Sequence, residues 1–269
     1  MTTIKNTIEV SSNALMTGEP SSVRIVPSMK KGIRFFVGGD IPILASLDNV
    51  VRTDHCVTLG SGSAIISLVE HFMAACAICG IDSLDVYCSH PELPILDGSS
   101  KTWVEKFDEA GIESSFTDKW VLKEPISYLN GKTHLVILPS NKLEISYAVN
   151  YNHPDLKNRW VSYSSETLHE IKEARTFGYL SELEMLQAHG FGRGVTYENT
   201  VGMKDDGTYT CELRSEFEPA KHKMLDLIGD LYLTGVNPLS LNVHIIAKEA
   251  GHAVHVKAAN LLKEKLVKE

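Results

Sequence analysis

The pattern of hydrophobic and polar positions divides the chain into two stretches of strands and helices. In the first stretch, short apolar runs between Gly and Pro residues predict strands, and a longer apolar run predicts a helix over 63–79 that ends at Gly80. Polar residues without periodicity follow at 111–118, and we interpret them as a linker. The strands are predicted at 7–10, 22–27, 33–38, 41–45, 50–59 and 84–89, with a second helix at 102–110.

The second stretch repeats the order of strands followed by helices. A capping box of Ser181 and Glu184 predicts a short helix that runs to Gly190. A stronger helix is predicted over 219–234, with Pro at its start and Gly just past its end. The remaining elements are strands at 120–126, 134–139, 142–149 and 240–248 and a final helix from about Val254. We therefore predict an α+β fold of two halves, 1–118 and 119–269.

Composition and charge narrow the classes of function. The 26 basic and 34 acidic residues give a formal net charge of −8, which argues against a nucleic-acid partner because phosphate binding needs a basic surface. The five Cys residues are too few and odd in number for a disulfide framework. The sequence contains neither an apolar signal segment nor a run of about 18 apolar residues. We expect a cytoplasmic protein without a transmembrane segment.

The predicted helix at 219–234 carries a polar stripe. The stripe covers an arc of about 100° around the helix axis and consists of His222, Lys223, Asp226 and Asp230. The spacing of four residues between His222 and Asp226 brings an imidazole and a carboxylate within reach of one cation. An ordinary amphipathic helix with a solvated face is the alternative. Two Asp residues inside a helix, without a capping role, count against that alternative because Asp is a poor helix former.

Glu70 and His71 are the ionisable residues of an otherwise apolar or small run, where burial is costly unless they have partners. They are either a structural pair, or a metal ligand and a base that acts on metal-bound water. A catalytic zinc site takes three protein ligands and leaves one position for water. His71, His222 and Asp226 would supply the three ligands. Both halves of the chain would then have to pack around the metal.

Three further motifs carry weaker signals. Cys76 and Cys79 form a competing metal motif, but without a second Cys pair they are more typical of buried core thiols. The Gly-rich segment 190–194 follows a helix and does not open one after a strand, so it lacks the context of a dinucleotide-binding loop. His252, directly after Gly251, is a candidate acid or base carried by a loop.

Together, five segments resemble the UDP-3-O-acyl-N-acetylglucosamine deacetylases, the zinc enzymes of the committed step in lipid A synthesis. They occur in the family's order and are spread over both halves of the chain. The segments are 69–71, 92–99, 174–177, 222–231 and 251–252.

The resemblance implies two α+β domains of similar topology, each a sheet layered against helices, with the active site at their interface. It implies that His71, His222 and Asp226 bind zinc, that Glu70 is the general base, and that His252 is the general acid or the cation that stabilises the oxyanion. The other implied roles are Asp230 orienting His252, Thr176 bonding the tetrahedral intermediate, Lys223 meeting the phosphate or polar head, Phe177 packing on the sugar, His55 at the entrance, and 179–203 forming an acyl passage. Arg193 could join Lys223 in a local cationic pocket.

The implied reaction is hydrolysis of the N-acetyl group of a UDP-sugar with an acyl chain, which releases acetate. We expect a monomer that can make transient contact with the inner face of a membrane. The chain departs from the family's pattern at Met16, Val195 and Lys221, where the family usually has His, Gly and Arg. The alternatives are a paralogue that deacetylates another N-acetylated sugar and a non-catalytic protein that binds UDP-sugars or lipid intermediates. A protein that only binds has no reason to keep a base beside three ligands and an acid.

Overall fold

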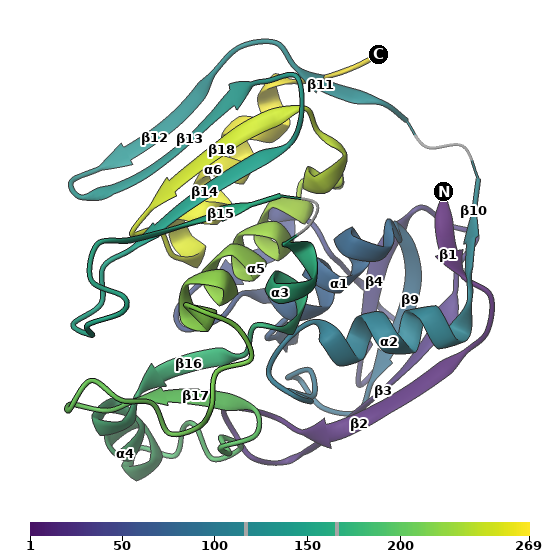
Figure 1. The fold of residues 1–269 in the computed structure, drawn as a ribbon. Coiled ribbons are helices and arrows are strands. Elements are labelled where there is room, and N and C mark those ends of the chain that lie inside the picture. The colour runs from purple at the N-terminus through teal and green to yellow at the C-terminus, as the bar shows by residue number, and fades with distance from the viewer. Residues whose placement is uncertain (116–117, 165–166) are drawn as a thin grey trace.

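The computed structural model describes residues 1–115, 118–164 and 167–269 and contains two five-stranded sheets of the same topology (Figure 1). In each sheet the third and fourth strands are parallel and all other neighbours are antiparallel. The predicted α+β fold of two similar sheet-and-helix halves is therefore confirmed. The first sheet has the order β2 (Ile8–Asn13), β3 (Pro20–Pro27), β9 (Ser83–Cys88), β4 (Gly32–Val37), β5 (Ile43–Leu44), and the second the order β12 (Ile126–Asn130), β13 (Thr133–Pro139), β18 (Val243–Lys248), β14 (Glu144–Val149), β15 (Arg159–Tyr163).

Each sheet buries one face. In β3 and in β18, buried and more exposed positions alternate, so that residues such as Val23, Ile25, Val243 and Ile245 point into the core. This period of two is the geometry of a half-buried strand, and it sets the register because a slip by one residue would expose the apolar side chains.

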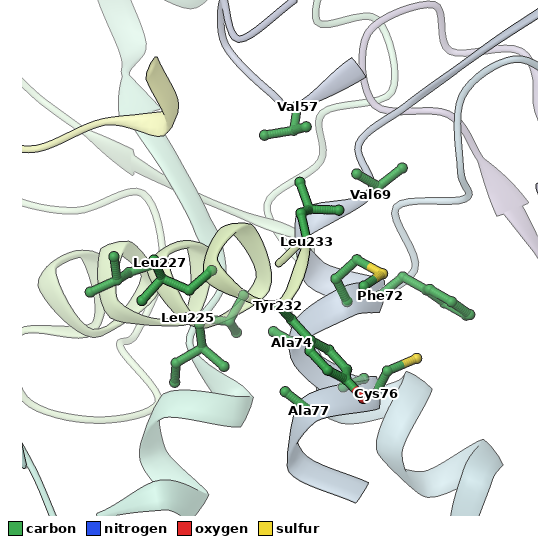
Figure 2. Close-up of a cluster of buried hydrophobic side chains, with 14 of the residues drawn as sticks. Val57, Val69, Phe72, Ala74, Cys76, Ala77, Leu225, Leu227, Tyr232 and Leu233 are labelled. Carbon is green, nitrogen blue, oxygen red and sulfur yellow. The ribbon is translucent and has the colours of Figure 1, made fainter. Parts of the chain in front are cut away.

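Two helices from different halves pack against each other between the sheets (Figure 1). They are α1 (Glu70–Cys79), which precedes β9, and α5 (Glu218–Tyr232), which precedes β18. Figure 2 shows Phe72 and Cys76 of α1 in one buried cluster with Leu225 and Tyr232 of α5. Each large side chain buried here stabilises the fold by about 1.5–3 kcal/mol. The contact between the halves is therefore part of the core.

The remaining helices flank this pair. α2 (Lys101–Ala110) packs on α1, whereas α3 (Leu168–Glu173) and α6 (His252–Lys265) pack on α5. α4 (Leu180–Ala188) lies apart from them, beside the pair of strands β16 and β17 (Figure 1). No helix within the described ranges combines the length and the apolar character needed to cross a bilayer.

Small sheets complete the structure. They pair β1 (Thr2–Ile4) with β10 (Ile112–Ser114), β11 (Trp120–Leu122) with β19 (Leu266–Lys268), β16 (Thr176–Tyr179) with β17 (Thr200–Met203), and β7 (Thr58–Ser61) with both β6 (Val50–Arg52) and β8 (Ala64–Ser67); short 3-10 turns lie at Leu47–Asn49 and Pro238–Ser240. The predicted linker is thus partly wrong, because β10 pairs with β1. Residues 116 and 117 of that linker lie outside the described residues, and the domain boundary after residue 118 stays a prediction.

Several predicted elements have the wrong bounds, and hairpin pairing explains two of them. The helix over 63–79 starts only at Glu70, because the residues of β8 pair with β7 and Leu68 has a left-handed φ of 64° that a helix cannot contain. The strand over 50–59 is two strands, since the chain turns at His55, whose φ is also 64°. In both cases the pairing of a hairpin overrides the local apolar pattern.

The predicted capping box is also wrong. α4 begins at Leu180, so Ser181 lies inside the helix and makes no cap hydrogen bond. The residue before the helix is Tyr179, the last residue of β16, which pairs with β17 and sets the direction in which the helix starts.

Candidate active site

The first turn of α1 presents Glu70 and His71. Both side chains are buried, with relative exposures of 2% and 4%. The backbone N–H of Val57 donates to Oε2 of Glu70 at 3.1 Å, which holds this carboxylate from the side of the β7 strand. Among the described contacts there is no hydrogen bond between Glu70 and His71. The hypothesis that these two residues form a hydrogen-bonded structural pair is therefore not supported.

α5 approaches this turn closely because it has a glycine there. A Cβ at Gly229 would lie 2.1 Å from the backbone oxygen of Glu70, a distance that no side chain tolerates. The polar stripe of α5 consequently faces the start of α1. His222, Asp226 and Asp230 of that stripe are at most 3% exposed. The interpretation of the stripe as a solvated face is therefore wrong.

His71, His222 and Asp226 converge on one point. Oδ1 of Asp226 lies 3.7 Å from Nε2 of His71 and 3.3 Å from Nε2 of His222, and the three ligand atoms lie within 4.8 Å of one another. Zinc with bonds of roughly 2.0–2.2 Å in a tetrahedral site separates its ligand atoms by about 3.4 Å. Oδ1 of Asp226 has no hydrogen-bond partner within the described residues. Two imidazole nitrogens and an unpartnered carboxylate oxygen are a donor set that fits a divalent cation.

The protonation of the two imidazoles suits this arrangement. His222 Nδ1 lies 2.9 Å from the carbonyl oxygen of Ala174, which favours the tautomer with the proton on Nδ1 and leaves Nε2 free. Burial lowers the pKa of His222, and burial together with the neighbouring His222 lowers the pKa of His71 to about 3. Both rings are thus neutral near pH 7, which is the form that binds a metal.

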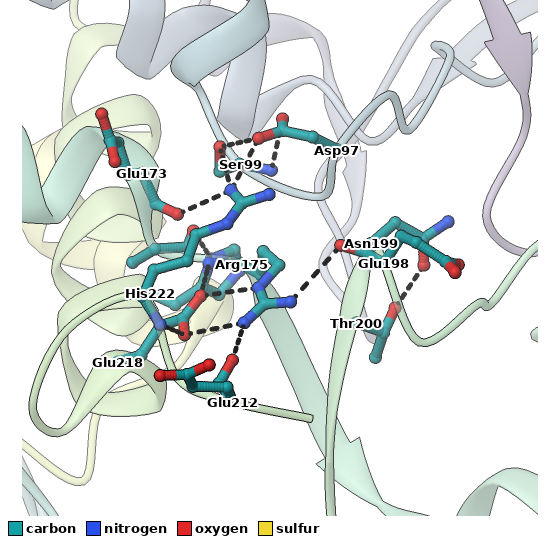
Figure 3. A network of polar contacts seen from close by, with 12 residues as sticks. Asp97, Ser99, Glu173, Arg175, Glu198, Asn199, Thr200, Glu212, Glu218 and His222 are labelled. Carbon is teal, nitrogen blue, oxygen red and sulfur yellow. Dashed lines mark hydrogen bonds and ion pairs between the residues drawn. The ribbon is translucent and has the colours of Figure 1, made fainter. Parts of the chain in front are cut away.

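The carbonyl of Ala174, which orients His222, lies next to a buried ion pair of Arg175 and Glu218 (Figure 3). Arg175, next to Ala174, donates from Nε to Oε1 of Glu218 at 2.9 Å, and its Nη2 donates to the carbonyl of Glu212 at 2.8 Å. Glu218 is the first residue of α5 and is fully buried. The pair therefore ties the start of α5 to the segment that leads into β16.

His252 also lies near Glu70. Its Nε2 lies 3.9 Å from Oε1 of Glu70, and its Nδ1 lies 2.8 Å from Oδ2 of Asp230. Burial raises the pKa of Glu70 to about 8. Burial alone would lower the pKa of His252, but the carboxylate of Asp230 raises it to about 9. The site thus places a carboxyl group whose pKa lies near neutral pH beside a cationic imidazole, so that one group can take up a proton and the other can release one.

Lys223 also turns into the site. Its Nζ donates to Oδ2 of Asp226 at 2.6 Å, and although burial alone would lower the pKa of this ammonium, Asp226 raises it. One oxygen of Asp226 is therefore bound by Lys223, and the other faces the two imidazoles.

A cavity of about 360 Å³ opens over these residues. Thr176, Phe177 and His55 line it together with Lys223 and the ligand cluster. Its remaining walls are largely apolar and come from both halves, among them Leu15, Met16, Leu68, Leu183, Leu186, Val195 and Met203. Twelve of the 25 residues in 179–203, where an acyl passage was expected, line this cavity.

Two of the predicted site residues lie outside the wall of the cavity. Asp230 is buried behind His252 and reaches the cavity only through that ring. Arg193 is exposed, and its backbone N–H donates to the carbonyl of Met16 at 3.2 Å. The structure therefore does not bring Arg193 together with Lys223.

The structure also adds residues that the sequence interpretation did not contain. Tyr151 lines the cavity and packs edge-on against Phe177 at 5.2 Å between ring centroids. His255 bonds to Asp230 at 2.8 Å. His255 follows His252 by three residues in α6, which begins at His252 and not at about Val254 as predicted, so His252 is not carried by a loop and the two rings share one face of the helix. Tyr151 carries no comparable local signal.

The competing cysteine motif is a core feature. Cys76 of α1 is fully buried (Figure 2), whereas Cys79 is half-buried, and burial raises the pKa of both thiols. Neither belongs to a group of candidate metal ligands within the described ranges. The interpretation of Cys76 as a buried core thiol is confirmed.

Comparison with known proteins identifies the family of the chain. The sequence profile of the family described as "UDP-3-O-acyl N-acetylglycosamine deacetylase", LpxC, matches residues 1–264. The chain belongs to this deacetylase family. Proteins named UDP-3-O-acyl-N-acetylglucosamine deacetylase resemble it over nearly its whole length. That of Geotalea uraniireducens is 37% identical, with 95% of this chain and 85% of the relative covered. That of Leptospira biflexa is 34% identical (97% and 88%), and that of Thermosynechococcus vestitus 30% (98% and 94%).

Proposed function

We propose that this protein is a zinc-dependent hydrolase that removes the N-acetyl group of UDP-3-O-acyl-N-acetylglucosamine and releases acetate. Membership of the deacetylase family supports this reaction, which the family carries out as the committed step of lipid A biosynthesis. The observation that carries the proposal is the buried cluster of His71, His222 and Asp226, with an unpartnered carboxylate oxygen, beside Glu70 and His252.

His71, His222 and Asp226 would hold the zinc ion. A zinc ion bound by three protein ligands lowers the pKa of a coordinated water to about 7 and polarises a carbonyl group. The close approach of α1 and α5 at Gly229 supports this assignment, because it fixes ligands from two helices around one point.

The residues beside the ligands would move the protons. Glu70 accepts a proton from the attacking water as the new C–O bond forms. His252, held by Asp230, stabilises the oxyanion or donates a proton to the departing amine as the C–N bond breaks. Thr176, at the wall of the cavity, donates a hydrogen bond to the tetrahedral intermediate. The products are acetate and a free amino sugar, so the atoms of one water are accounted for.

The cavity would seat the rest of the substrate. Phe177 packs against the sugar, and His55 lies at the entrance. Lys223 meets the phosphate or polar head, and the exposed Arg193 supplies a cation to the anionic nucleotide from outside the cavity. The apolar side chains contributed by residues 179–203 support a passage for the acyl chain.

The proposal also covers the compartment, the domains and the partners of the protein. All five Cys residues are free thiols, which suits a reducing compartment, and we place the protein in the cytoplasm. We propose two domains, 1–118 and 119–269, acting as a monomer without a nucleic-acid partner. The product is a lipid precursor, so transient contact with the inner face of a membrane is part of the proposal.

Metal content and acetate release together test the proposal. The purified protein should carry about one zinc per chain, release acetate from UDP-3-O-acyl-N-acetylglucosamine, and lose activity on chelation. His71→Ala and Asp226→Ala should lose zinc, whereas His134→Ala, on β13 away from the cavity, should keep both zinc and rate.

Two results would count against it. An Asp226→Ala variant with unaltered zinc content and rate would overturn the ligand assignment. A zinc-loaded protein that hydrolyses other N-acetylated sugars but not this UDP-sugar would favour a paralogue with a different substrate.

A further inference from the structure

One oxygen of Asp230 is shared by two imidazoles. Oδ2 of Asp230 lies 2.8 Å from Nδ1 of His252 and 2.8 Å from Nδ1 of His255. Asp230 and His255 are fully buried, and the other oxygen of Asp230, Oδ1, has no hydrogen-bond partner within the described residues. The two imidazole N–H groups are therefore the donors that hold this carboxylate in the described part of the chain.

The two rings come from the first turn of α6, three residues apart on the same face. They differ in what their second nitrogen meets. Nε2 of His252 faces the reaction centre, 3.9 Å from Oε1 of Glu70. Nε2 of His255 faces away, 3.0 Å from the hydroxyl oxygen of Tyr147. Because that hydroxyl donates its single proton to the carbonyl of Ala250 at 2.6 Å, Nε2–H is the donor in the contact with Tyr147.

We propose that His255 is a positioning residue for the deacetylation, which acts through Asp230 on the orientation of His252. This inference rests on the proposed function and deepens it. His255 does not line the cavity and therefore does not touch the substrate. Its Nδ1–H fixes Oδ2 of Asp230, and that oxygen in turn accepts the Nδ1–H of His252 and keeps the Nε2 of this ring turned to the reaction centre.

The physical reason is the way a buried carboxylate keeps its orientation. With two donors on one oxygen, rotation of the fully buried Asp230 carboxylate would break two charge-assisted hydrogen bonds where bulk solvent has no access. With the single donor of His252, both groups can turn together. The energy that holds His252 in place therefore includes a contact on the far side of Asp230.

A purely structural role is the competing explanation. His255 Nε2, Tyr147 and Ala250 link α6 to β14, and this link alone could explain why an imidazole is buried here. The two roles use different nitrogens of the same ring, so they can be separated by two amide substitutions. The amide nitrogen of Asn takes the place of Nδ1, and that of Gln takes the place of Nε2.

The experiment compares His255→Asn with His255→Gln in the zinc-loaded full-length protein. We expect His255→Gln to lower kcat by roughly 10- to 100-fold, the usual effect of losing a partner behind a metal-site residue, with KM and zinc content unchanged. We expect His255→Asn to keep most of kcat, because it still donates to Asp230. Thermal unfolding of both variants reports the structural contribution separately.

Three outcomes would overturn the inference. They are equal kcat values in the two variants, a lower kcat for His255→Asn than for His255→Gln, and the loss of a second equivalent of metal, which would make the three residues a metal site. If a variant does not fold, nitrogen NMR of the histidine side chains in the wild-type protein decides, since a His255 proton on Nε2 alone contradicts the proposal. A wild-type protein that releases no acetate would instead contradict the proposed function.

Discussion

Gly229 of α5 lies against the backbone oxygen of Glu70, so close that a Cβ at position 229 would stand 2.1 Å from that atom. This contact sets how near the two helices come, and the α5 ligands Asp226 and His222 lie about one and two turns before it. A larger residue has no space here, since the obstacle is backbone and cannot rotate away.

We expect Gly229→Ala to destabilise the protein by about 1–3 kcal/mol, the usual cost of overpacking a core, and to weaken zinc binding. Gly39→Ala is the control, because a Cβ there meets nothing within 4 Å. Urea unfolding and zinc titration measure the two effects. Equal stability of the two variants would show that the helices can separate freely.

Replacing Glu70 by Gln tests the general base. The amide oxygen can still accept the Val57 N–H, so the fold and the zinc content should be kept. The rate should fall by about 10²–10⁴, because Gln cannot accept the proton of the attacking water. Acetate release per bound zinc is the measurement, with Glu105→Gln on the exposed face of α2 as the control. A variant of Glu70 with full activity would remove this residue from the mechanism.

The buried pair of Arg175 and Glu218 predicts a dependence of stability on pH. Burial alone would raise the pKa of Glu218, but the hydrogen bonds from Arg175 lower it below its ordinary value of about 4.5. A carboxylate with a lowered pKa contributes stability that is fully present above its unfolded pKa and is lost as the pH falls through its folded pKa.

We therefore expect Glu218→Gln to cost about 3–5 kcal/mol at pH 7, the usual effect of breaking a buried pair. The difference from the wild type should shrink as the pH falls below about 4.5, because the native carboxylate also becomes protonated. Denaturant unfolding at pH 7 and at several values below 4.5 measures it. A difference that stays constant with pH would mean that the charge of Glu218 does not stabilise the fold.

The apolar wall of the cavity predicts a length-dependent effect on substrates. Leu186 of α4 lines the cavity, whereas Met185 beside it is 58% exposed and does not. Leu186→Asp should raise KM about tenfold for a substrate with a long acyl chain, and less for a short one. A tenfold change corresponds to about 1.4 kcal/mol, which is the free energy of burying about two methylene groups. Met185→Asp should change neither KM. Equal changes for both chain lengths would place the acyl group elsewhere.

Much of the site could be predicted because its residues are close in sequence or spaced by helical turns. His222, Asp226 and Asp230 share one face of α5 by their spacing alone, and the core strands follow their apolar alternation. The three ligands that a catalytic zinc site needs joined this stripe to His71 and Glu70 as one of two alternatives, and the resemblance to the family implied the same set. The alternatives that the local pattern left open, a solvated stripe above all, could be decided only by what packs against the helix.

The errors have the same origin. The apolar pattern predicts a helix for residues 64–67 because it continues without a break into α1, and only their pairing with β7 makes them a strand. Arg193 is cationic and near the expected passage, but the backbone contact of its loop with Met16 leaves its side chain exposed. The sequence does not reveal the partner of His255, because Asp230 lies on another helix, 25 residues earlier.

By itself, therefore, the sequence determined the periodic elements and the types of chemical group that each helix face presents, since these depend on neighbours within a few turns. Tertiary structure alone decided which faces are buried, which ligand atoms converge, and which imidazole nitrogen faces the cavity. Those properties depend on distances between residues far apart in the chain, such as Gly229 and Glu70, and local spacing contains no information about them.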